Sequence, residues 1–276
     1  MKIESIQSII TEKNIIILSP HYDDVLFMMG GYISEMKKEG HISDKEFEIK
    51  LLFSRSNYQA RTGESNFDTS IERIKMATGN RLIEDQNCIN ELLGEFNYHY
   101  ELMGEDESLI RGKFLADSRL EFPHGTYKDF DQKDDKIFER MKNRVKSYAM
   151  RSDTAVIFPL AIKEHIDHFI AREAGIVVAR ELGSKMKATF YFIEDKPYAG
   201  LANEEELDRT ENFIAENRLE SRLFTYDPEL MIDLAFHHYI SQVEEVYKKG
   251  VRSRASFWKT KMKVDHALDR ICVFKP

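Results

Sequence analysis

Residues 14–25 read NIIILSPHYDDV, and this stretch decides the fold class. It begins with three isoleucines and a leucine, a run that is typical of a fully buried strand in a parallel sheet. The run ends at Pro20, and His21, Asp23 and Asp24 follow at once. Ligands of open α/β sheets bind at the carboxyl ends of the strands, so these polar side chains stand where a site is expected.

Three further short apolar runs have the same character, and helical stretches separate them. The expected strands cover residues 14–19, 47–54, 154–160 and 187–193. The expected helices cover residues 25–38, 70–93, 136–150, 166–182 and 228–248. Strands that alternate with helices are joined by right-handed crossovers. The sequence therefore predicts an α/β fold, a Rossmann-like, doubly wound and mostly parallel sheet with helices on both faces.

The domain organisation is predicted from what the 276 residues lack. They contain no internal repeat, low-complexity tract or linker rich in proline, glycine and serine, so we predict one domain over residues 1–276. The stretch 94–135 fits the strand–helix alternation poorly, because it holds many acidic and aromatic residues and the turn-like sequence FPHG at 122–125. We predict an inserted loop region there, of the kind that shapes a pocket or an oligomer contact. The sequence leaves the oligomeric state open.

Composition narrows the class of partner and the compartment. Hydrophobic residues make up 42% and charged residues 32% of the chain, which are globular values. The formal charge of −8 disfavours nucleic acids and anionic membranes as partners. The only cysteines, Cys88 and Cys272, form no metal-like pair, and residues 1–13 lack a signal-peptide pattern. We therefore predict a cytoplasmic protein with no integral membrane segment, acting on a small molecule rather than a nucleic acid.

The polar cluster after the first strand has the composition of a metal site. His21, Asp23 and Asp24 offer one imidazole and two carboxylates within four residues, which could supply two ligands and leave one carboxylate free. Mixed nitrogen and oxygen ligands suit zinc. An alternative is that the aspartates cap the following helix, since Asp is a favoured N-cap residue. The cluster alone leaves both interpretations open.

A second cluster, Glu-His-Ile-Asp-His at 164–168, follows the expected strand 154–160. His165 and His168 are three residues apart, so both can face one side of a first helical turn, and Asp167 could orient an imidazole. The alternative is a surface helix start with acidic residues near its positive end. Because both clusters follow strands of one predicted sheet, we expect them to converge. Together they match the open zinc site of hydrolases, with three protein ligands and a water.

With these clusters the chain resembles the PIG-L/LmbE-like family of N-acetylglucosaminyl deacetylases. That family has Pro-His-Pro-Asp-Asp-Glu after its first strand and a later His-x-Asp-His, and the counterparts here are residues 20–25 and 165–168. Further similar segments are Gly30-Gly31, RLIED at 81–85, EDKPYA at 194–199 and YISQ at 239–242. These similarities occur in order and span nearly the whole chain.

The resemblance implies a metal-dependent hydrolase that removes the acetyl group from an N-acetylated amino sugar or its conjugate. It implies His21, Asp24 and His168 as ligands of zinc, or of another divalent metal. It implies that Arg81 binds the substrate, whereas the residues alone equally allow an ion pair between Arg81 and Glu84 on a helix surface. Hydrolysis of another amide, or a catalytically weak metal-containing protein kept for sugar binding or assembly, are the alternatives.

The resemblance also implies the catalytic residues. Asp23 would be the general base, and His165 would stabilise or protonate the tetrahedral intermediate while Asp167 tunes His165. Two positions depart from the family pattern: Val25 stands where the family has Glu, and Tyr22 where it has Pro. Loss of a carboxylate that supports a metal site lowers affinity or activity by about 10–100-fold, so Val25 bears on activity more than on metal binding.

Two groups of residues near the C-terminus are predicted to be structural. His237 and His238 are adjacent, so on a helix they would point in different directions and form no chelating pair. Trp258 lies in a basic stretch, residues 248–263, which we predict to be a solvated face.

Overall fold

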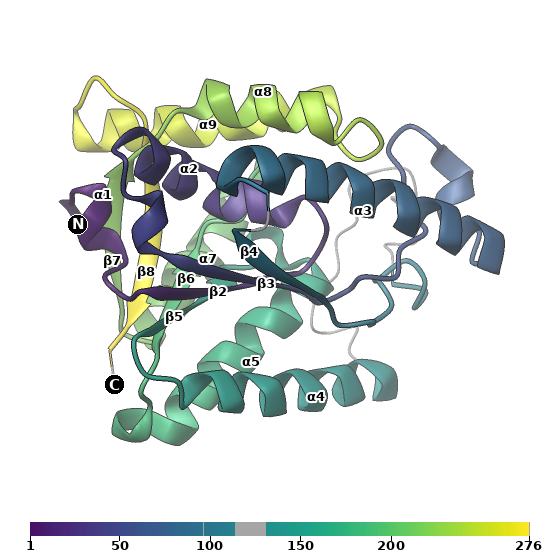
Figure 1. Cartoon of the computed structure of the whole chain (residues 1–276), viewed down its shortest axis with the longest axis horizontal. Helices are drawn as coiled ribbons and strands as arrows, with labels where there is room; N and C mark the ends of the chain where they lie inside the picture. The colour runs from purple at the N-terminus through teal and green to yellow at the C-terminus, as the bar shows by residue number, and fades with distance from the viewer. Residues whose placement is uncertain (96, 114–130, 276) are drawn as a thin grey trace.

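A mixed sheet of eight strands lies at the centre of the described structure (Figure 1). The structure is a computed structural model and describes residues 1–95, 97–113 and 131–275. The strand order is β1-β7-β8-β6-β5-β2-β3-β4. Neighbouring strands are parallel except that β8 runs antiparallel to both β6 and β7. The predicted α/β fold with a mostly parallel sheet is confirmed.

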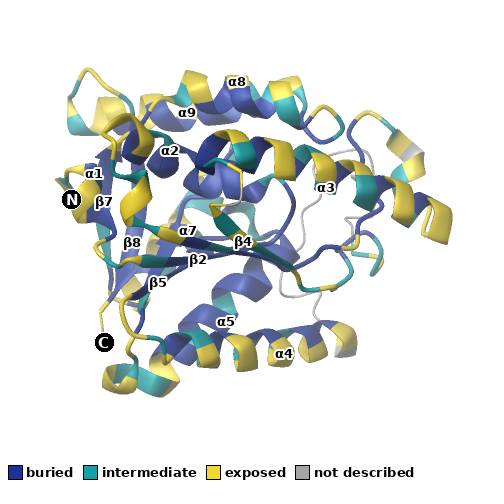
Figure 2. Cartoon of the chain, viewed as in Figure 1, coloured by how far each residue is buried: buried dark blue, intermediate teal, exposed yellow. Residues whose placement is uncertain are grey.

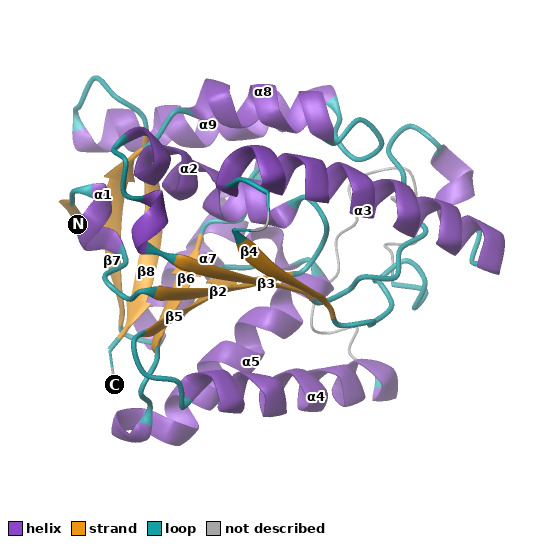
Figure 3. Cartoon of the chain, viewed as in Figure 1, coloured by secondary structure: helices purple, strands orange, loops and turns teal. Residues whose placement is uncertain are grey.

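Strands and helices alternate along most of the chain (Figure 3). The strands are β1 (Lys2–Ile3), β2 (Asn14–Ser19), β3 (Glu46–Leu51), β4 (Tyr98–Leu102), β5 (Thr154–Pro159), β6 (Thr189–Ile193), β7 (Leu219–Thr225) and β8 (Leu268–Phe274). The α-helices are α1 (Ile6–Ile9), α2 (Asp24–Lys38), α3 (Ile71–Leu93), α4 (Gln132–Ala149), α5 (Ile166–Leu182), α6 (Tyr198–Leu201), α7 (Glu204–Glu216), α8 (Pro228–His238) and α9 (Glu245–Met262). Of the helices described, none is long and apolar enough to cross a membrane. The cytoplasmic location stays a prediction.

Side-chain alternation in β2 explains why the sheet is covered on both faces. Successive side chains of a strand point to opposite faces. Ile15 and Ile17 belong to one apolar core with α2, α3, α8 and α9, whereas Ile16 and Leu18 belong to a second core with α4, α5 and α7. Figure 1 shows α4 and α5 on one side of the sheet and α2, α3, α8 and α9 on the other, and Figure 2 shows the strands between them buried. A strand that is buried on both faces reads as a continuous apolar run.

The strands that the sequence did not predict are those without such a run. β4 is a half-exposed edge strand, and β8 carries the buried charges Asp269 and Arg270. β4 lies inside the stretch 94–135 that was predicted as an inserted loop region, so that part of the prediction is corrected. Residues 114–130 of the same stretch lie outside the described residues. The prediction of one domain stays a prediction.

The predicted helix 228–248 is wrong in its length, because α8 ends at His238 and α9 begins at Glu245. The intervening turn bonds to α3 instead of continuing the helix. The Tyr239 hydroxyl donates to Asp85 at 2.7 Å, and the Ser241 hydroxyl donates to Glu84 at 2.8 Å. Side-chain partners on another helix thus replace the local helical pattern.

The prediction of a solvated face holds for only one side of the basic stretch of α9, where Lys249, Arg252 and Lys259 are exposed. Trp258 is fully buried and Arg254 is 3% exposed. The Trp258 indole N–H and the Arg254 guanidinium both donate to Glu194, which follows β6. One face of α9 therefore packs on the sheet through charged and aromatic side chains.

Candidate metal centre

The two predicted clusters meet at the carboxyl end of the central strands. β2 pairs with β5 in parallel, so the segments that follow them, 20–24 and 160–168, leave the same edge of the sheet. Asp23 takes the N-cap position of α2, but its side chain makes no capping hydrogen bond. The Asp24 carboxylate accepts the backbone N–H of His21 at 2.8 Å. Capping by the Asp23 side chain, the alternative that the sequence left open, is therefore absent.

The three implied ligands present one atom each to a common point. His21 Nδ1 lies 3.2 Å from Asp24 Oδ2, His168 Nε2 lies 3.1 Å from Asp24 Oδ2, and the two imidazole nitrogens are 3.3 Å apart. Metal–ligand distances of about 2.0–2.1 Å in a tetrahedral zinc site require ligand atoms about 3.3–3.4 Å apart. The donor set and its spacing therefore fit a tetrahedral zinc ion with three protein ligands.

Two carboxylates fix the orientation of the imidazoles. His21 Nε2 donates to Asp167 at 2.9 Å, and His168 Nδ1 donates to Asp195 at 2.8 Å. The remaining nitrogen of each ring, His21 Nδ1 or His168 Nε2, is thereby left as an acceptor. These two nitrogens and Asp24 Oδ2 form a triangle of candidate ligand atoms. The sequence paired Asp167 with His165, but its carboxylate lies against His21. It assigned Asp195, which lies in the family-like segment 194–199, no definite role.

The electrostatics of the centre favour a cation. Burial alone lowers the pKa of both imidazoles, yet the carboxylates around them raise the pKa of His21 to about 9 and of His168 to about 10. Burial alone would raise the pKa of Asp24, but the two imidazoles hold it well below its usual range. The buried carboxylates thus favour positive charge in the triangle, and a divalent metal would supply that charge by displacing protons.

Asp23 and His165 border the triangle in different protonation states. Burial, with the neighbouring charge of Asp24, raises the pKa of Asp23 to about 6. Burial and the charge of His21 lower the pKa of His165 well below its usual value. His165 Nδ1 accepts the backbone N–H of Asp167 at 3.3 Å, so the neutral ring carries its proton on Nε2. The structure therefore presents a carboxylate that can take a proton and an imidazole that can donate a hydrogen bond.

Arg81 lies behind Asp23, fully buried. Its Nη1 donates to Glu107 at 2.5 Å and to Ser56 at 2.6 Å, and its Nε donates to Gln242 at 2.7 Å. Arg81 Nη2 is 3.9 Å from Asp23 Oδ1. Glu84, the surface partner that the sequence allowed for Arg81, instead accepts hydrogen bonds from Ser241 and Gln242.

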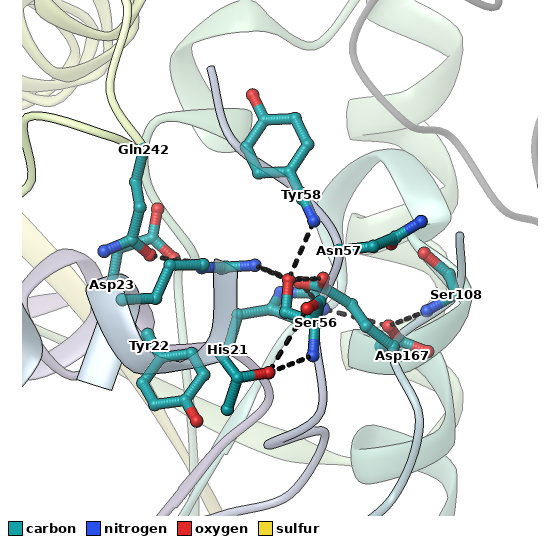
Figure 4. A network of polar contacts seen from close by, with 12 residues as sticks. His21, Tyr22, Asp23, Ser56, Asn57, Tyr58, Ser108, Asp167 and Gln242 are labelled. Atoms are coloured by element: carbon teal, nitrogen blue, oxygen red, sulfur yellow. Dashed lines mark hydrogen bonds and ion pairs between the residues drawn. The ribbon is translucent and has the colours of Figure 1, made fainter. Parts of the chain in front are cut away.

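Glu107 is a residue that the sequence did not single out. It follows β4, and its Oε1 reaches within 3.7 Å of His21 Nε2. Figure 4 shows the surrounding network, in which the Ser108 backbone N–H donates to Asp167 and the Tyr58 N–H donates to Ser56. No sequence motif marks this segment, because it lies in the region that was predicted as an inserted loop.

A small cavity connects these groups. It has a volume of about 30 Å³ and is lined by His21, Asp23, Tyr58, Arg81, Glu107, Ser108, Leu109, His165, Tyr198 and Tyr247. A larger cavity of about 560 Å³ lies against α5 and α7, but no candidate ligand or catalytic residue lines it. The small cavity is therefore the one that belongs to the centre.

The two departures from the family pattern have different surroundings. Val25 is fully buried in the apolar core that covers α2. Tyr22 packs below Arg81, with the guanidinium carbon 5.4 Å from the ring centroid, and its hydroxyl donates to the Ser54 carbonyl at 2.7 Å. Tyr22 thus supports the wall of the cavity, whereas Val25 contributes no polar group to it.

The fold and this cluster define an α/β protein with three candidate metal ligands grouped at the strand ends. No protein-family model matches the chain, and no curated protein matches its sequence. Solved structures of deacetylases do share its fold. These structural neighbours belong to the PIG-L/LmbE-like family, so the resemblance seen in the sequence is confirmed for the fold.

Three of these neighbours illustrate the similarity. A deacetylase of teicoplanin biosynthesis in complex with teicoplanin has a TM-score of 0.59 and 16% identity, with 95% of this chain and 98% of that chain covered. The zinc-inhibited form of teicoplanin deacetylase has a TM-score of 0.59 and 16% identity, with 94% and 97% covered. The N,N'-diacetylchitobiose deacetylase from Pyrococcus horikoshii has a TM-score of 0.51 and 14% identity, with 95% and 84% covered.

Proposed function

We propose that the chain is a metal-dependent hydrolase, with zinc as the metal, that removes the acetyl group from an N-acetylated amino sugar or its conjugate. The observation that carries this proposal is the triangle of His21 Nδ1, Asp24 Oδ2 and His168 Nε2 beside the cavity that Asp23 and His165 line. The fold similarity to deacetylases named for teicoplanin and for diacetylchitobiose supports the choice of an amino-sugar substrate.

The side chains around the cavity can carry out amide hydrolysis. His21, Asp24 and His168 would hold a divalent metal, which would serve as a Lewis acid and lower the pKa of a water. Asp23 takes a proton from the attacking water as the water oxygen bonds to the carbonyl carbon. His165 Nε2–H donates a hydrogen bond to the oxyanion that forms. The proton on Asp23 then passes to the nitrogen as the carbon–nitrogen bond breaks, and the products are acetate and a free amine.

Arg81 has a supporting role in this proposal. Its guanidinium is saturated on two sides by protein partners and faces Asp23 on the third. A buried cation there stabilises the ionised form of Asp23, the form that acts as a base. Arg81 also lines the cavity, where a substrate hydroxyl could reach its guanidinium, as the family resemblance implies.

The test is acetate release from a panel of N-acetyl amino sugars and their conjugates. We expect release that stops with a chelator and returns with Zn²⁺. Asp24→Ala and His168→Ala should each lose most of the bound metal, whereas Asp23→Asn should keep the metal and lose about 10²–10⁴-fold in turnover. Asp44→Ala, at a solvent-exposed ion pair with His41, is the matched control and should change neither property.

A sugar-binding protein with little or no turnover is the second candidate. The observation that favours it is Val25, an apolar core residue at the position of the family's Glu. Metal-replete protein that binds N-acetyl sugars in calorimetry, yet releases no acetate from any of them, would refute the hydrolase and support this candidate. Full metal retention in both ligand variants would refute the centre itself.

A further inference from the structure

A second group of metal-binding side chains lies at the surface, where the ends of α3 and α8 meet. Glu91 belongs to the last turn of α3, and His237 and His238 end α8. One ligand atom of each residue lies within 4.8 Å of the others. His238 Nε2 is 2.6 Å from a Glu91 carboxylate oxygen, and the two imidazole rings meet edge to face with centroids 4.6 Å apart.

The two histidines lie close together although both belong to α8. Within a continuous helix, adjacent side chains diverge by about 100°, which is why the sequence predicted no chelating pair. Here Tyr239 is the C-cap, with φ −96° and ψ 51°, and the chain turns towards α3. The distances between the ligand atoms of Glu91, His237 and His238 thus allow a shared metal that the sequence did not predict.

The chemistry and the electrostatics of the cluster both favour a cation. Two imidazole nitrogens and one carboxylate oxygen are the donor set of zinc and of similar divalent transition metals. Glu91 lies in the last turn of α3 and both histidines lie in the last turn of α8, where the negative end of a helix dipole favours positive charge. Lys37, the nearby cation, bonds the backbone carbonyl of Glu91 at 2.7 Å and not its carboxylate.

We propose that Glu91, His237 and His238 form a second metal site, which binds a divalent transition metal of the zinc class and clamps α3 to α8. The site is separate from the candidate centre and does not depend on the proposed function. It is open, with Glu91 and His237 exposed, so water completes the coordination and the affinity is lower than at the buried centre.

The position of the clamp gives it a structural consequence. The residues that follow α8 are tied to α3 by Tyr239 on Asp85 and by Gln242 on Arg81. A metal between Glu91 and the end of α8 would add a link about two helical turns further along α3. We therefore expect occupancy to stabilise the contact between α3 and α8, the contact that holds Arg81 in the cavity wall.

Zinc titration of the metal-free full-length chain by calorimetry tests the proposal. We expect two classes of site, and Glu91→Ala and His237→Ala should each remove the weaker class alone. Asp24→Ala should remove the tighter class and leave the weaker, so failure of one site is distinguished from failure of the other. His99→Ala, an exposed histidine on β4, is the control and should keep both classes.

A second readout does not depend on counting sites. In the Asp24→Ala background, added Zn²⁺ should still raise the thermal midpoint, because only the native chain holds Glu91 and the two histidines together. Adding His237→Ala should abolish that increase. A wild-type chain with a single class of site, or an unchanged weaker class in both cluster variants, would overturn the proposal.

Discussion

Asp195 determines which nitrogen of His168 is free to bind a metal. Its Oδ2 accepts His168 Nδ1–H at 2.8 Å, and its Oδ1 accepts the backbone N–H of Ile162 at 3.1 Å, so the carboxylate is held from both sides. Because Asp195 follows β6 and His168 follows β5, two neighbouring strands fix one imidazole. The orientation of the candidate ligand thus depends on the sheet and not only on its own helix.

Replacing Asp195 should therefore weaken metal binding without removing a ligand. We expect Asp195→Ala to lower zinc affinity by about 10–100-fold, because the imidazole loses its orientation and its preferred tautomer. Competition with a chelating dye measures this affinity. The exposed Asp265 offers a control, and Asp265→Ala should leave the affinity unchanged. Equal affinities in wild type and Asp195→Ala would contradict this role.

The buried ion pair of Glu107 with Arg81 leads to a second prediction for single residues. Both side chains are almost fully buried, so removing one leaves an uncompensated charge out of water. We expect Glu107→Ala to reduce the free energy of unfolding by about 3–5 kcal/mol, measured by urea denaturation of the metal-free chain. The pair of Glu105 and Arg140, with side chains 17% and 55% exposed, provides the contrast, because Glu105→Ala should cost at most about 1 kcal/mol. Similar losses in the two variants would show that burial does not matter here.

The sequence predicts the candidate ligands but not the side chains that support them. His21, Asp24 and His168 stand in short motifs directly after buried strands, and strand ends of one sheet must converge. Glu107 follows an edge strand with no apolar run. Asp195 can be assigned only once the order of β5 and β6 in the sheet is known. Contacts across the sheet are a tertiary property, so no local pattern predicts them.

At the scale of elements, two glycines let α6 and α9 touch. A Cβ on Gly200 would lie 1.7 Å from the carbonyl oxygen of Gly250, and a Cβ on Gly250 would lie 2.6 Å from the Pro197 side chain. Tyr198 of α6 and Tyr247 of α9 both line the cavity. The close approach of these helices therefore sets one wall of the candidate centre.

A methyl group at this contact should separate the two helices. We expect Gly200→Ala to destabilise the chain by about 3 kcal/mol, because the atom that it meets is backbone and cannot rotate away. Gly79 in α3 is the matched control: its Cβ would meet nothing within 4 Å, so Gly79→Ala should stabilise by about 0.5–1 kcal/mol. Thermal unfolding of the two variants gives the comparison. A Gly200→Ala variant as stable as wild type would show that the helices can shift at no cost.

The elements that could be predicted are those whose burial is uniform. β2 and β5 read as apolar runs because helices cover both of their faces. β8 was missed because Asp269 and Arg270 interrupt its apolar pattern, although every one of its residues is buried. The end of α8 at His238 was missed because the turn after it is held by hydrogen bonds to α3, which lies more than a hundred residues earlier in the chain. Where a distant partner replaces local preference, the sequence pattern misleads.

At the scale of the whole molecule, a buried charge network joins the sheet to α9. Glu194 accepts a hydrogen bond from Arg254 and forms an ion pair with Arg270, and Lys196 donates to Asp269 at 2.7 Å. All five side chains are at most 3% exposed. The network lies directly beside Asp195, so the packing of α9 and β8 supports the segment that orients His168. The two acids of the network, Glu194 and Asp269, change the stability of the fold with pH in opposite directions.

The sign of each response follows from the direction of its pKa shift. Burial opposes ionisation of Glu194, but Arg254 and Arg270 overcome it and lower its pKa to about 2. Stability from Glu194 is therefore complete above its unfolded pKa of about 4.3 and is lost as the pH falls towards 2. Burial raises the pKa of Asp269 to about 6 against the opposing effect of Lys196. The native chain then binds the extra proton between about pH 4 and 6, so this acid makes stability fall as the pH rises through that range.

Two variants separate the loss of stability at low pH, the acid limb, from the decline between about pH 4 and 6. The measurement is urea denaturation of the metal-free chain between pH 2.5 and 7 (about one reading per half unit). Glu194→Gln should be less stable than wild type at about pH 6, by roughly 3–5 kcal/mol, because two buried arginines lose their anion. Its stability should also fall less steeply below about pH 4.3, since the titrating group is gone. Asp269→Asn should keep the acid limb and flatten the decline between about pH 4 and 6. If Glu194→Gln retained the full acid dependence, the acid limb would belong to other carboxylates, and the network would not link α9 to the acid stability of the fold.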